Sequence, residues 1–368
     1  MKFTKYHSMA DILAYPRMAE YLHIFYSDEL LGMFPEELYE EPIAMVEHFA
    51  KTPWEEPFFV VADQLVDTAN LILEICEEKT RRCLSLWDKE GGDWSLEKED
   101  RGGKESVFLL APEKKEENRG KKRPAAVICP GGGYEAVCFS GEGTPVLRIL
   151  ETKGYCVFIL KYRTSPNCYP APQEDLALAI QYVRANAAEY GLDPENVLVI
   201  GASAGGHLCA TESALHEESA RLADAQLAQE DAELAARYGR FSARPDKLCL
   251  SYPVISLEQE PHEGSFQALT GGDETLRHAL SAENLVTENY PPAFVWTCAD
   301  DDCVPPSNAR RMAEALKEKQ VPYRLRMYPS GSHGCGLAYS KSAYTWSREM
   351  LEFMEEIGHP QWRRENEI

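Results

Sequence analysis

From residue 107 onward, seven short and mostly uninterrupted runs of apolar residues recur along the chain. Such runs, in contrast to alternating ones, are typical of strands that are buried on both faces of a mainly parallel sheet. Helical patterns lie between them, for example over 173–190, which Gly191 is expected to terminate, and over 307–319. This alternation predicts an α/β fold with a doubly wound, mostly parallel sheet. The expected strands are Val107–Leu110, Ala125–Ile128, Cys156–Leu160, Val197–Ile200, Leu248–Leu250, Ala293–Trp296 and Tyr323–Met327.

The first 80 residues follow a different pattern, in which apolar residues have helical spacing and prolines interrupt them. We therefore expect a helical N-terminal extension over 1–80 that packs on an α/β domain over 81–368. The polar segment Glu113–Arg123 is expected to be a hairpin loop. The helical spacing covers Met18–Phe25, Pro42–Phe49 and Asp63–Cys76.

The charge of the chain argues against two classes of partner. Its 60 acidic and 38 basic residues give a net charge of −22, which repels phosphate backbones and anionic lipid. We therefore expect neither a nucleic-acid nor a membrane partner. No apolar run has the length of a signal peptide or of a spanning helix. The 11 cysteines contain no Cys-x-x-Cys pair, so we expect buried thiols in a reducing cytoplasm and no metal site.

The segment Gly201-Ala202-Ser203-Ala204-Gly205 joins the apolar run Val197–Ile200 to a helical pattern. This is the context of the nucleophile elbow, G-x-S-x-G, whose turn is too tight for bulky residues on either side of the serine. The partial positive charge of the following helix N-terminus favours a developing oxyanion. A dinucleotide loop would need glycine at 203, and a phosphate loop would need the sequence Gly-Lys-Ser/Thr, which is absent here. We therefore predict Ser203 as a nucleophile.

A second glycine-rich segment, Pro130-Gly131-Gly132-Gly133-Tyr134, also follows a predicted strand directly. A loop without side chains lets the backbone approach a substrate carbonyl and donate N–H groups to it. We expect an oxyanion hole made by the N–H of Gly132 or Gly133 together with that of Ala204.

A serine hydroxyl needs a base, and the chain has nine histidines. His333 lies in a loop just after the last predicted strand, where α/β sheets place their catalytic groups. His207 is a rival four residues after Ser203, but on a helix it would point away from the hydroxyl. We therefore predict His333 as the base and a packing or hydrogen-bonding role for His207.

The base needs a carboxylate to hold its tautomer. Three aspartates, Asp300, Asp301 and Asp302, follow the predicted strand Ala293–Trp296, and any of them could serve. The order serine, aspartate, histidine along the chain is the order expected in α/β-hydrolases.

From Pro124 to Ala338 the chain resembles the acetyl-xylan and feruloyl esterase-like branch of the α/β-hydrolases, next to the hormone-sensitive-lipase-type esterases. The family pattern places its acid at D-x-x-V-P, which falls on Asp301–Pro305 and implies Asp301 rather than Asp300. Thr297 and Cys298 stand where the family often has His-Thr. The resemblance rests on Pro130–Tyr134, Glu142-Gly143, Tyr162-Arg163, Gly201–Leu208, Ser251–Val254, Pro291–Phe294 and Gly331–Gly334.

The resemblance implies structural roles for residues outside the triad. It suggests that Tyr134 and Glu142 line the substrate cleft, with packing or loop fixing as equal alternatives, and that Tyr162-Arg163 buttresses the sheet edge or the oxyanion loop. The segment Glu217–Tyr238, rich in Ala, Glu and Asp, is not part of the family pattern. We expect an exposed helix there, inserted at about 216–243, as a cap, a homo-oligomer contact or a solvated excursion.

The resemblance also implies a serine esterase that forms an acyl-enzyme without a cofactor. Its substrate would be a small-molecule ester with a small acyl group, often acetyl, on an alcohol such as a sugar hydroxyl of an imported oligosaccharide. One alternative is a prolyl-oligopeptidase-like peptidase, against which the short helical N-terminal segment counts. Another is a catalytically silent α/β-hydrolase that binds ligands or acts as a scaffold.

Overall fold

The computed structural model describes residues 2–26, 38–45, 62–88, 92–114, 122–339 and 341–358. Its centre is a sheet of eight strands in the order β1-β2-β4-β3-β5-β6-β7-β8. Strands β3 to β8 are parallel to one another, and β2 is antiparallel to both of its neighbours. The bounds are β1 Arg81–Ser85, β2 Phe108–Pro112, β3 Arg123–Cys129, β4 Cys156–Lys161, β5 Leu192–Ala202, β6 Lys247–Ser251, β7 Ala293–Cys298 and β8 Tyr323–Tyr328.

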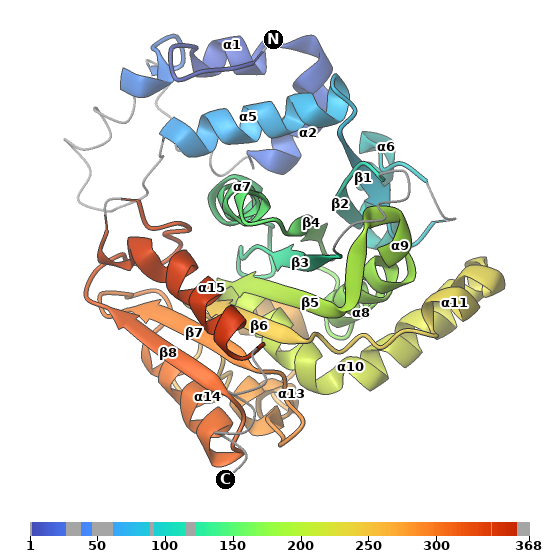
Figure 1. Cartoon of the computed structure of the whole chain (residues 1–368), viewed down its shortest axis with the longest axis vertical. Helices are drawn as coiled ribbons and strands as arrows, with labels where there is room; N and C mark the ends of the chain where they lie inside the picture. The colour runs from blue at the N-terminus through green and yellow to red at the C-terminus, as the bar shows by residue number, and fades with distance from the viewer. Residues whose placement is uncertain are drawn as a thin grey trace.

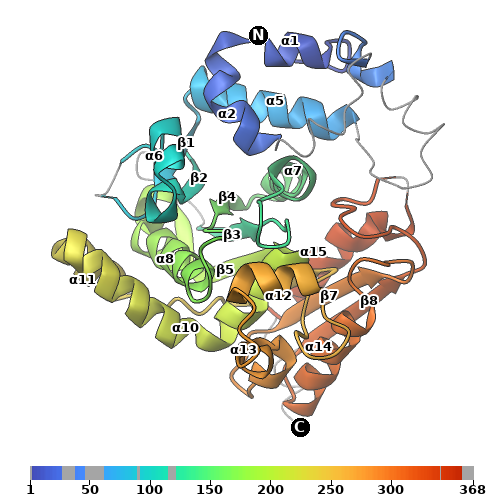
Figure 2. The same ribbon diagram turned by 180° about the vertical axis from the view of Figure 1, so that it is seen from behind.

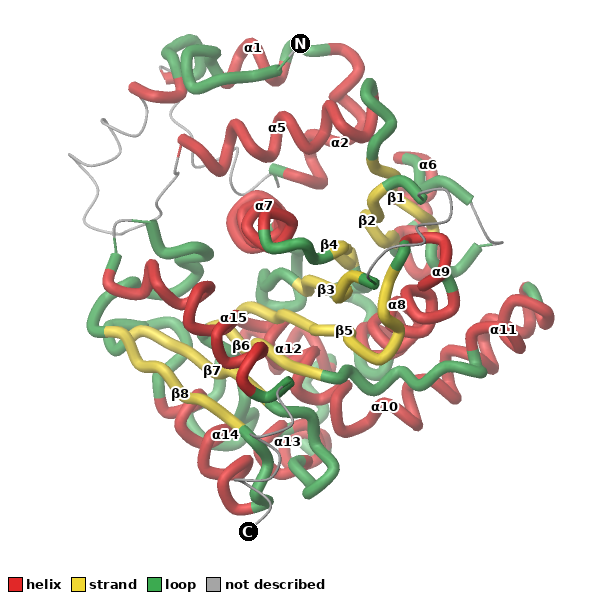
Figure 3. The backbone as a smooth tube through the Cα atoms, viewed as in Figure 1, coloured by secondary structure: helices red, strands yellow, loops and turns green. Residues whose placement is uncertain are grey.

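Helices cover both faces of this sheet, and the views from opposite sides agree on their placement (Figures 1 and 2). Helices α7 and α15 lie on one face, and α8, α10 and α14 lie on the other. The band of strands between two helical layers is clear in Figure 3. Because both faces are covered, central side chains such as Val127, Phe158 and Val199 are fully buried, which explains the uninterrupted apolar runs. The bounds are α7 Thr144–Thr152, α8 Ala171–Ala185, α10 Ser203–Glu230, α14 Ser307–Glu318 and α15 Trp346–Glu356.

A further layer of N-terminal helices packs on the outside of α7 (Figure 1). It contains α1 (Met9–Leu13), α2 (Ala19–Phe25) and α5 (Ala62–Cys76), and residues 46–49 of the predicted helix over 42–49 lie outside the described residues. None of the helices in the described ranges is long and apolar enough to cross a membrane. The remaining elements are η1 Pro16–Met18, α6 Leu96–Arg101, η3 Gly103–Ser106, η4 Phe139–Gly143, α9 Ala187–Tyr190, α11 Ala232–Tyr238, α12 Glu263–Thr270, α13 Leu276–Leu280, η5 Ala282–Leu285 and η6 Ser342–Thr345.

The predicted α/β fold is confirmed, and each of the seven expected strands is present as one of β2 to β8. Strand β1 was not expected, because Arg81 and Arg82 interrupt its apolar pattern. The Arg81 guanidinium is nevertheless buried, since it forms ion pairs with Glu74 of α5 and Glu151 of α7. Pairing with carboxylates is what allows a charged side chain to be buried at a sheet edge.

The expected hairpin over Glu113–Arg123 is wrong. Strands β2 and β3 are not neighbours, because β4 lies between them and pairs with both: Ile159 is opposite Leu110 on one side and Ile128 on the other. Strand β3 uses its two edges for β4 and β5. The segment between β2 and β3 is therefore a crossover past β4.

The separate helix expected over Glu217–Tyr238 is also wrong in its start and in its exposure. Helix α10 runs without a break from Ser203 to Glu230, and α11 begins only after Asp231, whose side chain caps it. No glycine or proline occurs between 207 and 230 to end the helix. Ala223 and Leu227 are fully buried, because this extension packs along α8.

Helix α10 also buries a carboxyl group, that of Glu212. Burial raises the pKa of the Glu212 carboxyl well above its usual value of 4.5, and the Ser219 hydroxyl offsets this only in part. In the unfolded chain the group ionises near its usual value. As the pH rises above about 4.5, the unfolded state therefore loses this proton before the folded state does, and stability falls.

Glu212→Gln is therefore expected to raise the free energy of unfolding more at pH 8 than at pH 5. The gain relative to wild type should grow by about 1.4 kcal/mol per pH unit until the folded-state carboxyl ionises. Urea unfolding of both proteins at several pH values measures this difference, and Glu218→Gln on the exposed face of α10 is the matched control. A gain that does not depend on pH would contradict the buried, protonated carboxyl.

Candidate active site

Ser203 stands at the junction of β5 and α10, with a backbone φ of +51°. Such a value is rare for a residue with a side chain and marks the strained turn of a nucleophile elbow. A β-carbon on Gly201 would lie 2.2 Å from the carbonyl oxygen of Gly205, and one on Gly205 would lie 2.1 Å from that of Cys129. Both positions therefore require glycine, for the steric reason expected from the sequence.

The structure brings Ser203, His333 and Asp301 together in one hydrogen-bonded chain. The His333 ring lies with Nε2 2.8 Å from Ser203 Oγ and with Nδ1 2.8 Å from Asp301 Oδ2. Asp301 is buried, and its other oxygen accepts the backbone N–H groups of Cys303 and Val304 at 3.1 and 2.9 Å. The carboxylate thus accepts a hydrogen bond from the Nδ1–H of His333, which leaves Nε2 without a proton and able to accept a hydrogen bond from the serine hydroxyl.

Asp300, the alternative acid, points to a different target. Its Oδ1 accepts the backbone N–H groups of Gly331 and Ser332 at 3.0 and 2.9 Å. Both belong to the loop that carries His333. Asp300 therefore holds the backbone of that loop, and Asp301 contacts the imidazole itself.

His207, the rival histidine, lies on α10 away from the serine hydroxyl and is fully buried. Its Nε2 is 2.7 Å from the carbonyl oxygen of Leu280, so it carries the proton, and Nδ1 accepts the hydroxyl of Tyr134 at 2.9 Å. Burial lowers the pKa of His207 to about 4, which keeps the ring neutral near pH 7. His207 therefore has the hydrogen-bonding role that the sequence suggested.

The glycine-rich loop after β3 lies directly against the nucleophile. A β-carbon on Gly131 would lie 2.8 Å from the β-carbon of Ser203, and the φ values of Gly132 and Gly133 are +125° and +64°. No other residue type would adopt this path so close to the serine. The loop therefore packs directly against the start of α10 at Ser203.

Tyr134 and Glu142 do not line an open cleft. The Tyr134 ring is 1% exposed, and its hydroxyl binds His207. Glu142 is 7% exposed, and its carboxylate accepts the backbone N–H of Gly131 at 2.6 Å. Both side chains are held by protein groups, so they fix the glycine-rich loop, which was the alternative to substrate contact.

The Tyr162-Arg163 pair supports the same loop from the end of β4. The Tyr162 hydroxyl donates to the carbonyl oxygen of Pro130 at 2.7 Å. The buried Arg163 guanidinium is paired with Asp175 at 2.8 Å and Glu174 at 2.9 Å. The prediction of a buttress therefore agrees with the contacts, which anchor the loop to α8.

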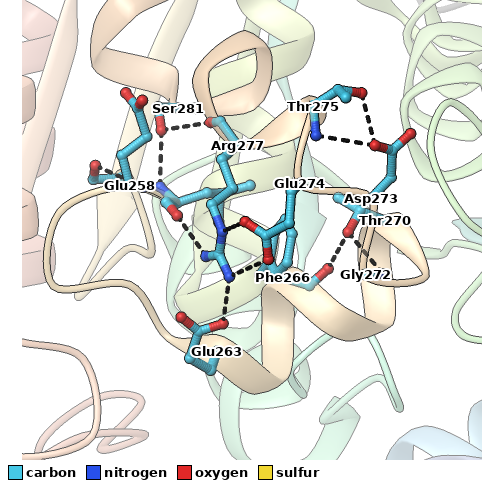
Figure 4. Close-up of polar contacts among 12 residues, drawn as sticks. Glu258, Glu263, Phe266, Thr270, Gly272, Asp273, Glu274, Thr275, Arg277 and Ser281 are labelled. Atoms are coloured by element: carbon cyan, nitrogen blue, oxygen red, sulfur yellow. Dashed lines mark hydrogen bonds and ion pairs between the residues drawn. The ribbon is translucent and has the colours of Figure 1, made fainter.

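Arg277 holds together the segment that follows β6. Figure 4 shows the guanidinium reaching Glu263 of α12 and Glu274, with Nη2 at 3.0 and 2.9 Å from their carboxylates. Nη1 donates to the carbonyl oxygen of Leu257 at 2.8 Å.

His262 directly precedes α12 and caps it. Burial, and then the nearby charge of His333, lowers the pKa of His262.

Sequence reasoning assigned no role to one buried residue of the site, Tyr252. Its ring packs edge-on against His333 at a centroid distance of 5.1 Å, and its hydroxyl donates to Glu142 at 2.9 Å. The signal in the sequence was its position two residues after the predicted strand Leu248–Leu250. Within the described ranges no cluster of three or more His, Cys, Asp or Glu side chains could hold a metal ion.

Comparisons with known proteins point to esterases. The BD-FAE family model matches residues 113–316. Endo-1,4-beta-xylanase B of Butyrivibrio fibrisolvens is 33% identical over 233 residues, which are 61% of this chain and 34% of that protein. Acetylxylan esterase of Xylanibacter ruminicola is 27% identical over 242 residues, 64% of this chain and 44% of that protein. The chain thus spans less than half of either relative.

Two solved structures are also similar to this chain. The acetyl ester-xyloside bifunctional hydrolase from Caldicellulosiruptor lactoaceticus matches with a TM-score of 0.59 and 34% identity, over 68% of this chain and 88% of that one. The carboxylesterase Cest-2923 from Lactobacillus plantarum shares the fold with a TM-score of 0.56 and 24% identity, over 76% and 97% of the two chains.

Proposed function

Since this chain belongs to the BD-FAE family of α/β-hydrolase esterases, we propose that it is a serine carboxylic ester hydrolase with the triad Ser203, His333 and Asp301. The observation that carries the proposal is the pair of 2.8 Å contacts that His333 makes with the serine hydroxyl and the aspartate. A strained serine between a glycine-rich loop and a helix N-terminus has the geometry of acyl transfer.

In the proposed mechanism, Ser203 Oγ attacks the ester carbonyl carbon while His333 Nε2 takes the proton of the serine hydroxyl. The carbonyl oxygen becomes an oxyanion, to which the N–H groups of Gly132, Gly133 and Ala204 donate. Collapse of this intermediate breaks the bond to the alcohol oxygen, which receives the proton from His333 and leaves. The acyl group is then bound to Ser203 as an acyl-enzyme. A water molecule that is deprotonated by His333 attacks it in the same way, and the carboxylic acid is released.

We propose a small acyl group, acetyl first, on a sugar hydroxyl of an acetylated oligosaccharide. The names of the relatives support this, because they include an acetylxylan esterase and an acetyl ester-xyloside hydrolase. Ester chemistry at this site needs no cofactor, since the base, the acid and the oxyanion donors are all protein groups.

A substrate panel with the purified protein tests the proposal. We expect p-nitrophenyl acetate to be hydrolysed faster than esters with longer acyl chains, and acetate to be released from acetylated xylo-oligosaccharides. An aminoacyl-proline amide should be turned over far more slowly, because an amide has a poorer leaving group. Faster amide than ester turnover would favour a peptidase, and no reaction with a fluorophosphonate probe would defeat the hydrolase proposal.

A further inference from the structure

We propose that Glu142 and Tyr252 are positioning residues that link the glycine-rich loop to the histidine loop, and that the negative charge of Glu142 favours protonated His333. The inference rests on the proposed esterase function. Neither side chain reaches substrate, because Glu142 is 7% and Tyr252 1% exposed. They would act through the groups that they hold.

The carboxylate of Glu142 lies behind the glycine-rich loop, close to the nucleophile. Its Oε2 accepts the N–H of Gly131 at 2.6 Å. That oxygen and the β-carbon of Ser203 each lie 2.8 Å from the place where a β-carbon of Gly131 would stand. Glu142 therefore fixes the start of the loop whose next two residues, Gly132 and Gly133, are the proposed oxyanion donors.

Tyr252 continues the link from Glu142 to the other loop. Its hydroxyl accepts the N–H of Gly336 at 3.1 Å, so its own proton goes to Glu142 Oε1 at 2.9 Å. Its ring packs edge-on against His333, three residues before Gly336. Tyr252 has a φ of +34°, and such strain in a residue with a side chain is often found at functional sites.

The pattern of donors around Glu142 favours its ionised form. Both oxygens accept hydrogen bonds, one from an N–H and one from an O–H, which is the arrangement that stabilises a carboxylate. Burial raises the pKa of Glu142 above its usual value, and the charge of His333 and these two hydrogen bonds offset this rise only in part. In a water-poor interior such a charge acts strongly on an imidazolium nearby.

Other groups around His333 set the background for this effect. Asp301 binds Nδ1 directly and supplies the main negative charge. His262, from the segment before α12, has an electrostatic interaction with His333, and Cys335 with Glu142. Glu135, which follows the glycine-rich loop, is an exposed carboxylate that interacts electrostatically with His262. Among these, Glu142 is a buried carboxylate that can be neutralised without touching the His333–Asp301 contact.

The test compares Glu142→Gln, Tyr252→Phe, the double variant and the exposed control Glu135→Gln, with p-nitrophenyl acetate over a range of pH. E142Q is expected to lower kcat/KM by about 10- to 100-fold, the scale of a displaced catalytic loop. It should also move the ascending limb of the pH profile to lower pH, because protonated His333 loses a nearby negative charge. E135Q should leave both quantities close to wild type.

Y252F is expected to lower kcat/KM with a smaller shift of the limb, because the carboxylate remains. The double variant should be about as slow as the slower single variant, since both changes break one link. Circular dichroism checks the fold of each variant. If E142Q is insoluble, the rate of Y252F relative to wild type tests the link between the two loops. Wild-type rates in E142Q or Y252F, additive losses, or an unmoved limb in E142Q would overturn the inference. An inactive wild-type protein would instead defeat the proposed function.

Discussion

Ser203→Ala is expected to lower kcat for p-nitrophenyl acetate by about 10⁴-fold or more, because it removes the hydroxyl that we propose forms the acyl-enzyme. The residual rate over the uncatalysed reaction would come from the oxyanion donors and from binding. The fold should persist, since alanine is smaller than serine and adds no contact in the turn. KM should change little, because the hydroxyl contributes to the transition state and only slightly to binding.

The measurement is steady-state kinetics together with labelling by a fluorophosphonate probe, which reacts with activated serines. The wild-type protein should be labelled, and S203A should not. Ser213→Ala is the matched control, since Ser213 lies on the same helix and its hydroxyl donates to the carbonyl oxygen of Cys209 at 2.7 Å. Labelling of S203A at the wild-type level would move the nucleophile to another residue.

The second large effect separates two neighbouring aspartates. Asp301→Asn is expected to lower kcat by about 10³- to 10⁴-fold, because the amide cannot stabilise the imidazolium and favours the wrong tautomer of His333. Asp300→Asn should cost less than about tenfold, because an amide oxygen can still accept the N–H groups of Gly331 and Ser332. The two substitutions make the same chemical change at adjacent positions. The difference between their losses in kcat therefore reports the contact with the imidazole.

Kinetics of the two variants on one ester, with thermal unfolding of each, provide the comparison. Thermal unfolding of D300N is compared with that of wild type, since Asp300 holds the backbone of the loop that carries His333. Equal losses in both variants, or a larger loss in D300N, would show that Asp301 is not the orienting acid.

The sequence predicted the fold well wherever the signal was local. A strand buried on both faces must be apolar along its whole length, so β2 to β8 were visible as runs. The elbow was equally visible, because its steric limits act between residues four positions apart, as the contact between Gly201 and the Gly205 carbonyl shows. The geometry now places His333 beside Ser203, although 130 residues separate them in the chain.

Features that depend on distant partners were less accessible. Strand β1 was missed, since only the carboxylates of α5 and α7 make its arginine compatible with burial. The hairpin between β2 and β3 was expected because strand order does not follow from apolar runs, and β4 was placed between them by pairing. The exposure of the second half of α10 was misjudged, because a polar composition does not show that one face of the helix packs against α8.

By itself, the sequence determined the α/β fold, the position of the strained serine and the two glycine-rich turns, because backbone sterics and side-chain burial act over short stretches. The family pattern in the sequence favoured Asp301 over Asp300, and the tertiary structure points their side chains to different targets. It also decided that Glu142 and Tyr252 meet across 110 residues behind the site. Hydrogen bonds of that kind are set by the packing of whole elements, which no local pattern records.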